Sequence, residues 1–145
     1  MTGFRGWRIC HMKVTPLRLT PGADLRLALE NWMAQQSEQA SCLISGIGSL
    51  SVAQLRLAGR KESTILRGEL EILGLAGTLC ADGAHLHIAI ADSSGSVIGG
   101  HLCLGSLVRT TAELVVGLLP EWQFRRQLDP ATGYAELQIR PVPPT

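Results

Sequence analysis

Along most of this chain apolar and polar residues alternate one by one, which is the pattern of half-buried β-strands. The alternation is clearest from residue 84 to residue 91, where His85 and His87 alternate with three aliphatic residues at 86, 88 and 90. Further strands are predicted at residues 12–19, 41–57, 63–67, 68–73, 96–104, 112–119, 122–128 and 134–140. Turns are predicted at 58–62 and 129–133, and the Gly/Ser-rich stretch 45–49 is expected to break the 41–57 run.

One segment shows helical spacing instead. Between residues 25 and 33 the apolar residues recur every three or four positions, which predicts a helix with one core-facing stripe. We expect Thr20 to cap it and Pro21 to occupy the first helical position. An early helix followed by a series of strands predicts an α+β fold, with an antiparallel or mixed β-sheet of about seven or more strands packed on one main helix. We expect a single domain over residues 1–145, with its core at about 12–140.

Composition adds few constraints on function. Of the 145 residues, 46% are hydrophobic and 17% charged, as in a soluble globular protein, and the net charge of +1 gives no strong attraction for nucleic acid or anionic membranes. No segment is long and apolar enough to span a membrane or direct secretion, so we expect a cytoplasmic protein. The scattered cysteines at 10, 42, 80 and 103 are expected to be reduced and buried. The nearly all-apolar run 112–119 is expected to be buried on both faces, within the chain or against another subunit.

The candidate chemistry lies in one predicted β-hairpin. Three of the four histidines, His85, His87 and His101, fall within residues 85–101. If the connecting loop is residues 93–95, a type I turn closed by a left-handed glycine, Asp92 pairs with Ser96 and His87 lies opposite His101. A loop one residue shorter or longer turns the third histidine to the other face, and a bulge at residues 99–100 would also change the register.

In the three-residue-loop register all three imidazoles share one face of the hairpin. Zinc favours nitrogen and sulfur ligands in near-tetrahedral geometry, so His85, His87 and His101 are candidate ligands of a zinc-like divalent metal. The fourth position would go to water, to a substrate or to Cys103, which His85 faces in this register. The alternative is that these histidines only cover a polar strand face or make hydrogen bonds.

Four segments in chain order resemble the plants-and-prokaryotes-conserved (PPC) domain family. They are RLTPGAD at residues 18–24, ISGIG at 44–48, GELEILGLAGT at 68–78, and the pair His85-Leu-His87 and Gly99-Gly100-His101-Leu102. The resemblance covers about residues 12–140. It implies an α+β fold that assembles as a homotrimer, and a metal held by His85, His87 and His101. Bacterial members of the family stand alone and are often labelled as candidate DNA-binding proteins, whereas in plants the domain is attached to an AT-hook and makes protein contacts. The plant contact motif Gly-Arg-Phe-Glu-Ile-Leu reads GELEIL at residues 68–73 here, with arginine and phenylalanine both replaced.

These observations favour a homotrimeric metal-binding scaffold, sensor or small-molecule binder, and leave DNA binding as the alternative. Against DNA binding, an AT-hook needs an Arg-Gly-Arg-Pro core, which the nearest stretch, residues 5–8, lacks. There is no basic run, helix-turn-helix pair or zinc finger either. A phosphate-contacting patch would need trimerisation to gather Arg5, Arg8, Lys13 and Arg18.

A metal-dependent hydrolytic enzyme is the weaker alternative. It would need a carboxylate beside the metal as general base, and the available acids are Glu69, Glu71 and Asp92. Their more ordinary roles are a solvated strand face and a turn. The segment 45–49 lacks both the Gly-x-Ser-x-Gly order of a nucleophile and the lysine of a phosphate-binding loop, so we expect a tight bend where backbones approach closely.

Overall fold

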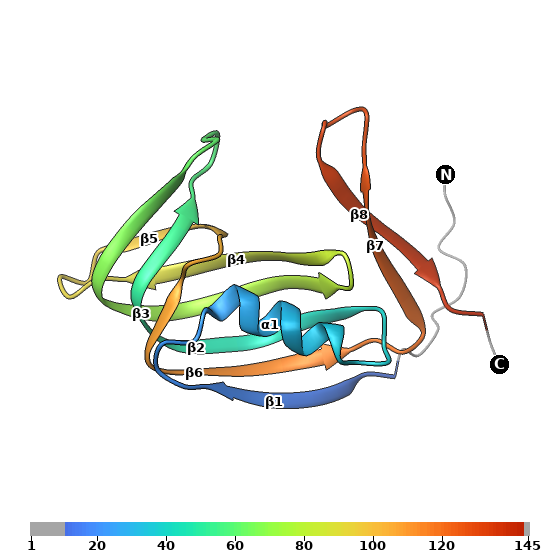
Figure 1. Cartoon of the computed structure of the whole chain (residues 1–145), viewed down its shortest axis with the longest axis horizontal. Coiled ribbons are helices and arrows are strands. Elements are labelled where there is room, and N and C mark those ends of the chain that lie inside the picture. The colour runs from blue at the N-terminus through green and yellow to red at the C-terminus, as the bar shows by residue number, and fades with distance from the viewer. Residues whose placement is uncertain (1–10, 144–145) are drawn as a thin grey trace.

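The computed structural model describes residues 11–143, which form eight strands and one helix (Figure 1). In chain order these are β1 (Lys13–Leu19), α1 (Leu25–Ala34), β2 (Ser41–Arg56), β3 (Ser63–Cys80), β4 (Gly83–Ala91), β5 (Val97–Leu102), β6 (Leu107–Leu118), β7 (Trp122–Leu128) and β8 (Ala135–Pro141). The predicted strands are confirmed, with two differences in their bounds. Residues 63–67 and 68–73 belong to one long strand, β3, which continues to Cys80, and β6 begins at Leu107 rather than at residue 112. The expected break at 45–49 is wrong, because β2 runs through it.

The strands form two antiparallel sheets. Six of them lie in the order β1-β6-β2-β3-β4-β5, and β7 pairs with β8 in a separate hairpin. The end of β2 also pairs with β5, through Leu55 with Leu102 and Arg56 with His101. Strands β2 to β5 therefore curl into a partly closed barrel rather than an open sheet, and β5 splits from β4 to reach β2.

Bulges explain why β2 stays a single strand through its glycines. The pairing of β2 with β6 shifts register after Leu43 and again after Gly48. A Cβ on Gly48, where φ is +141°, would lie 2.1 Å from the carbonyl oxygen of Thr111. The close backbone approach expected for this segment is confirmed, and the bulges absorb the extra residues without ending the strand.

The helix begins later than the sequence predicted. Asp24 is the N-cap, since its Oδ1 accepts a hydrogen bond from the backbone N–H of Leu27 at 3.1 Å. Its other carboxylate oxygen accepts from the N–H of Gly105 at 2.6 Å, a contact 81 residues away that local pattern does not reveal. Thr20 instead starts a turn, where its carbonyl accepts from the N–H of Ala23. The expected roles of Thr20 and Pro21 are therefore wrong, because a tertiary contact favours the later cap.

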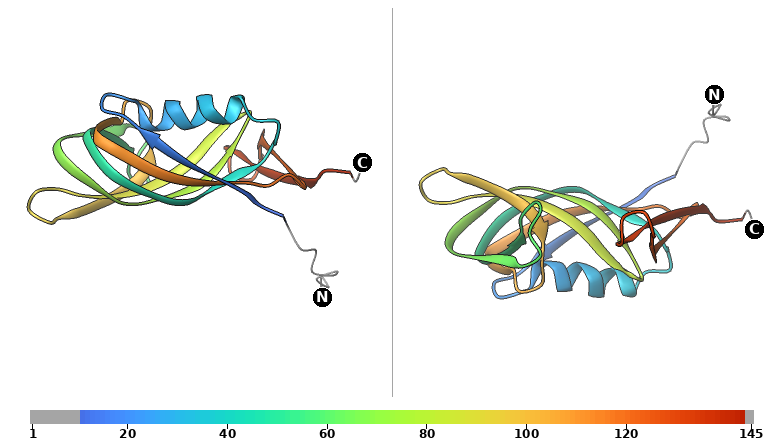
Figure 2. Two further views of the ribbon diagram at one scale, coloured as in Figure 1. Left: turned by 90° about the horizontal axis from the view of Figure 1, so that it is seen from below. Right: turned by 90° about the horizontal axis from the view of Figure 1, so that it is seen from above.

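The main core lies between α1 and the concave face of the six-stranded sheet (Figure 2). Leu25, Leu29 and Met33 form the buried stripe of the helix, as predicted. One ten-residue helix against eight strands makes the described fold mostly antiparallel β, so the α+β label holds only loosely. The strands predicted for one sheet are divided between two.

The apolar run of β6 is covered within the chain. The strand lies between β1 and β2, and residues 112, 114, 116 and 118 are buried. Another subunit is therefore not needed to shield most of it from water. Cys80 is buried and Cys103 half-buried, while Cys10 lies outside the described residues. No helix within residues 11–143 is long and apolar enough to cross a membrane.

Candidate metal centre

The histidine hairpin has the register on which the three-histidine hypothesis depends. The backbone N–H of Asp92 donates to the carbonyl of Ser96 at 3.0 Å, and Gly95 closes the three-residue loop with a φ of +83°. His87 pairs directly with His101. The glycine pair at 99–100 stays in register with β4, so the bulge considered above does not occur.

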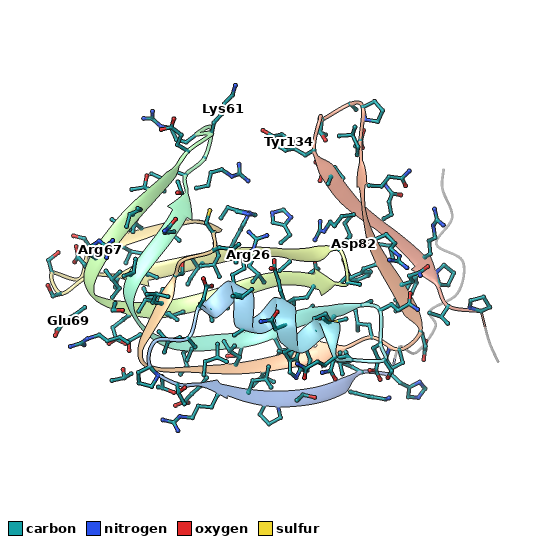
Figure 3. The ribbon with its side chains drawn as sticks, viewed as in Figure 1. Arg26, Lys61, Arg67, Glu69, Asp82 and Tyr134 are labelled. Atoms are coloured by element: carbon teal, nitrogen blue, oxygen red, sulfur yellow. The ribbon has the colours of Figure 1, made fainter. Side chains whose placement is uncertain are left out.

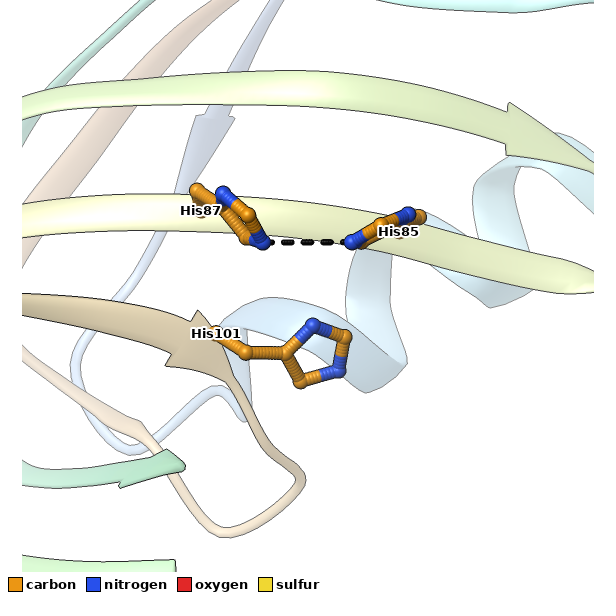
Figure 4. A group of neighbouring side chains, drawn as sticks. All are labelled: His85, His87 and His101. Carbon is orange, nitrogen blue, oxygen red and sulfur yellow. Dashed lines mark hydrogen bonds between the residues drawn. The ribbon is translucent and has the colours of Figure 1, made fainter. Parts of the chain in front are cut away.

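The three imidazoles meet on one face of this hairpin (Figure 4). The Nε2 atoms of His85 and His87 are 3.1 Å apart, and the ring centroids of the three histidines are 4.9 to 5.8 Å from one another. One nitrogen from each ring lies within 4.8 Å of the others. The structure therefore brings together all three residues that the sequence singled out.

The spacing of these nitrogens fits a small tetrahedral cation. Two nitrogens that each bind zinc at about 2.0–2.1 Å stand roughly 3.3 Å apart in tetrahedral geometry, close to the separation of His85 and His87. Figure 4 shows Nδ1 of His101, the nitrogen next to the ring carbon that joins Cβ, on the side of the other two rings. Among residues 11–143 this Nδ1 is the one buried side-chain nitrogen or oxygen without a hydrogen-bond partner. A buried orphan nitrogen aimed at two further imidazoles suits a metal ligand.

Arg26 on α1 bridges β4 and β5 at the point where these two strands separate. Its Nη1 donates to the carbonyl of Leu102 at 2.9 Å and its Nη2 to the carbonyl of Ala84 at 3.1 Å, so one guanidinium joins the two diverging strands. Its Nε donates to Glu30 Oε1 at 2.9 Å, and the same oxygen accepts from the N–H of Ala84 at 3.2 Å. Both side chains are about four-fifths buried, with 21% and 24% of their surface exposed. The Arg26–Glu30 pair thus fixes the backbone on either side of the histidines.

The contact with Arg26 also determines which ring nitrogen of His101 carries the hydrogen. Its Nη1 lies 3.2 Å from His101 Nε2, and because a guanidinium only donates, Nε2 must accept and Nδ1 must carry the hydrogen of the neutral ring. A metal on Nδ1 requires the opposite tautomer.

The positions of His85 and His101 lower the pKa values of both rings. Burial, followed by the charges of Arg56 and Arg26, lowers the pKa of His101 to about 4. Burial, then the charges of His87 and Arg126, also lowers the pKa of His85, with Glu136 acting in the opposite direction. Since only a neutral imidazole binds metal, these shifts keep two of the three rings ready to act as ligands at pH 7.

A cavity of about 420 Å³ opens beside the cluster, between the six-stranded sheet and the β7–β8 hairpin. His85 and His101 lie on its wall, and Tyr134 stands at the tip of the hairpin above it (Figure 3). The other charged side chains of its lining are Arg26, Arg56, Asp82, Arg126 and Glu136. None of these was predicted as a site residue, because they come from four elements and the β3–β4 turn, which only the folded chain brings together.

The acids proposed as general bases lie elsewhere. Glu69 forms an ion pair with Arg109 near the bend of β3 and does not line the cavity (Figure 3), and Glu71 is exposed and does not line it either. Asp92 accepts hydrogen bonds within its own turn from Ser94 and Ser96, which lower the pKa of its carboxyl. The sulfur of Cys103 donates to the carbonyl of His101 and is not among the clustered ligand atoms.

The basic residues considered for DNA contact do not form a patch within the described chain. Lys13 forms an ion pair with Glu38 at 2.6 Å, and Arg18 donates to Thr111 at 3.1 Å. Arg5 and Arg8 lie outside the described residues.

Sequence comparison identifies relatives along most of the chain. The profile of the Plants and Prokaryotes Conserved (PCC) domain matches residues 11–120. Two curated proteins from Synechococcus, each named bifunctional protein GlmU, are 53% identical over 131 residues. That stretch is 90% of this chain and 21% of the relatives, so the chain spans about a fifth of the length of the curated relatives it matches.

Solved structures share the fold. A hypothetical protein from Salmonella cholerae-suis is 39% identical with a TM-score of 0.88, over 92% of this chain and 97% of that one. A protein from Archaeoglobus fulgidus described as metal-containing is 26% identical with a TM-score of 0.74, over 91% and 99% of the two chains. A protein from Bacteroides thetaiotaomicron, described as a candidate DNA-binding protein, is 21% identical with a TM-score of 0.74, over 90% of this chain and 98% of that one. At this identity the two proteins are similar in fold alone.

Proposed function

The chain belongs to the Plants and Prokaryotes Conserved domain family, and we propose that it is a homotrimeric protein whose histidines His85, His87 and His101 hold a divalent cation, zinc by preference, and present it to a small molecule. The observation that carries the proposal is the convergence of three imidazole nitrogens within 4.8 Å. The metal-containing relative from Archaeoglobus supports it.

Each part of the cluster has a separate task in this function. His85 and His87 supply a pair of exposed nitrogens from one strand, and His101 supplies the buried third nitrogen from the neighbouring strand. The bound cation would act as a Lewis acid toward a ligand in its remaining position. Arg26 fixes the strands that carry His85 and His101, so the ligands are held before the cation arrives.

Metal binding is tested by titrating EDTA-treated protein with Co²⁺ and then displacing it with Zn²⁺. We expect one Co²⁺ per chain, an absorption spectrum of a four-coordinate ion, and a melting temperature that rises with metal concentration. Binding should weaken as the pH falls toward about 4, where His101 takes up a proton and can no longer act as a ligand. Absence of stoichiometric binding at pH 7 would contradict the function.

The trimer part of the proposal rests on an exposed apolar surface beside the histidines. A second cavity, of about 510 Å³, lies on β2, β3 and β4 and is lined by His87 together with Ile44, Ile47 and Leu73. Those three aliphatic side chains are each half or more exposed, at 50%, 52% and 54%. Contiguous exposed aliphatic residues are typical of surfaces that other chains cover.

Sedimentation of the wild type and two matched variants tests the assembly. We expect the wild type at about three times the chain mass of 15.6 kDa, and Leu73→Glu at the mass of one chain, because a buried unpaired carboxylate opposes association. Leu128→Glu is the control, since Leu128 is 68% exposed on the β7–β8 hairpin, away from this surface. Equal masses for both variants would argue against this surface as the contact.

DNA binding stays the alternative, because a solved structure with the same fold is described as a candidate DNA-binding protein. That protein resembles this chain in fold alone. Within residues 11–143 the cationic side chains nearest the histidines line a concave cavity rather than a ridge or stripe. Duplex DNA is contacted by protruding helices, strands or arms, so the geometry favours a compact ligand.

A further inference from the structure

We propose that the cavity beside the histidines is an anion-binding site in which Arg56 and Arg126 hold a compact phosphorylated or carboxylated molecule. This inference deepens the proposed function and rests on it for the metal, which would face the same ligand through His85 and His101. The two arginines are nevertheless arranged for an anion independently of any metal.

Arg56 contributes a positive charge to the wall of the cavity. It pairs with His101 across β2 and β5 and lines the same cavity as that histidine. Within residues 11–143 it is half-buried, and its side chain makes no hydrogen bond or ion pair. A guanidinium that is partly removed from water without a partner gains most from an oxyanion that accepts its paired N–H groups.

Arg126 faces the same cavity from the β7–β8 hairpin. Its Nη2 donates to Thr78 Oγ1 at 2.7 Å, and Thr78 is the cross-strand partner of His85. This bond uses one of the five N–H donors of the guanidinium and fixes its position beside the histidines. Arg56 and Arg126 therefore approach the cluster from two different elements, β2 and β7.

The remaining charges of the lining do not cancel these two arginines. Arg26 is paired with Glu30, and Asp82 is held by the side chain of Arg125 and the backbone N–H of Arg126. Glu136 accepts a hydrogen bond from Thr132 and is the one remaining acid. The cavity thus has a net positive charge before a cation binds and a larger one afterwards.

The size of the cavity limits the ligand class. A volume of about 420 Å³ suits a small metabolite, and the hollow shape excludes a duplex. Phosphate and carboxylate groups each offer two oxygens that accept paired N–H groups from the planar guanidinium of arginine, so the common requirement is an oxyanion on a compact molecule.

Isothermal calorimetry with inorganic phosphate and with succinate tests this proposal and separates the two anion types. Each is titrated into metal-free protein and into protein loaded with one equivalent of Zn²⁺ and desalted. We expect Arg56→Gln to weaken binding of the preferred anion about tenfold or more, because a charge-assisted hydrogen-bond pair is lost. Arg60→Gln should bind as the wild type does, since Arg60 is exposed outside the cavity.

The outcomes separate this site from the metal function. Normal Zn²⁺ binding with anion affinity unchanged in Arg56→Gln, or with no anion bound by the wild type, overturns the anion site and leaves the metal centre intact. Anion binding that depends on Arg56 in protein that fails to hold Zn²⁺ supports the anion site while the metal function fails. Displacement of the anion by a short DNA duplex would overturn the assignment to a compact ligand.

Discussion

Replacement of His87 by alanine is expected to lower the affinity for Zn²⁺ by more than about 100-fold, because loss of a ligand costs more than loss of an outer partner. His87 is the appropriate ligand to remove, since it is exposed and lies outside the arginine-lined cavity. The fold should therefore persist, as measured by circular dichroism. Competition with a chromophoric chelator measures the affinity.

Two further variants distinguish a ligand from a merely structural histidine. His87→Cys is expected to recover part of the affinity, because thiolate is also a zinc ligand. His11→Ala should bind Zn²⁺ as the wild type does, since His11 lies against Glu121 and outside the cluster. Equal affinities for the wild type and His87→Ala would mean that the imidazoles meet without holding a metal.

The histidine cluster could be predicted from sequence because its geometry is set locally. A three-residue loop with glycine at the left-handed position fixes the pairing of Asp92 with Ser96, and counting along the two strands then places His87 opposite His101. Every step of that argument lies within 17 residues of chain, where turn chemistry determines the register.

The surroundings of the cluster could not be predicted in this way. Arg26 comes from the helix, Arg56 from the end of β2 and Arg126 from the hairpin that follows β6. Their proximity depends on the closure of β2 onto β5 and on the position of the β7–β8 hairpin, both of which are long-range contacts. The same limit applies to Asp24, whose capping role is reinforced by a residue 81 positions away.

The long strand β3 shows how a glycine links the fold to the site. Gly77 pairs with Leu86 on β4, and its φ of +146° is a conformation that residues with a Cβ rarely adopt. A Cβ at this position would lie 2.0 Å from the carbonyl oxygen of His85 and 2.9 Å from the Cα of Leu86. The absence of a side chain at Gly77 therefore lets β4 approach closely at the strand segment that carries a metal ligand.

Gly77→Ala is accordingly expected to lower the free energy of unfolding by about 3 kcal/mol or more, from backbone strain of about 1–3 kcal/mol and from weakened ladder hydrogen bonds of about 1 kcal/mol each. It should also weaken Zn²⁺ binding, because β4 must move away at His85. Gly74→Ala is the matched control on the same strand, since a Cβ there meets nothing within 4 Å. Its stability should stay within about 1 kcal/mol of the wild type. Urea denaturation of the metal-free proteins measures both effects, and equal midpoints for the two variants would show that β4 does not need the close approach at Gly77.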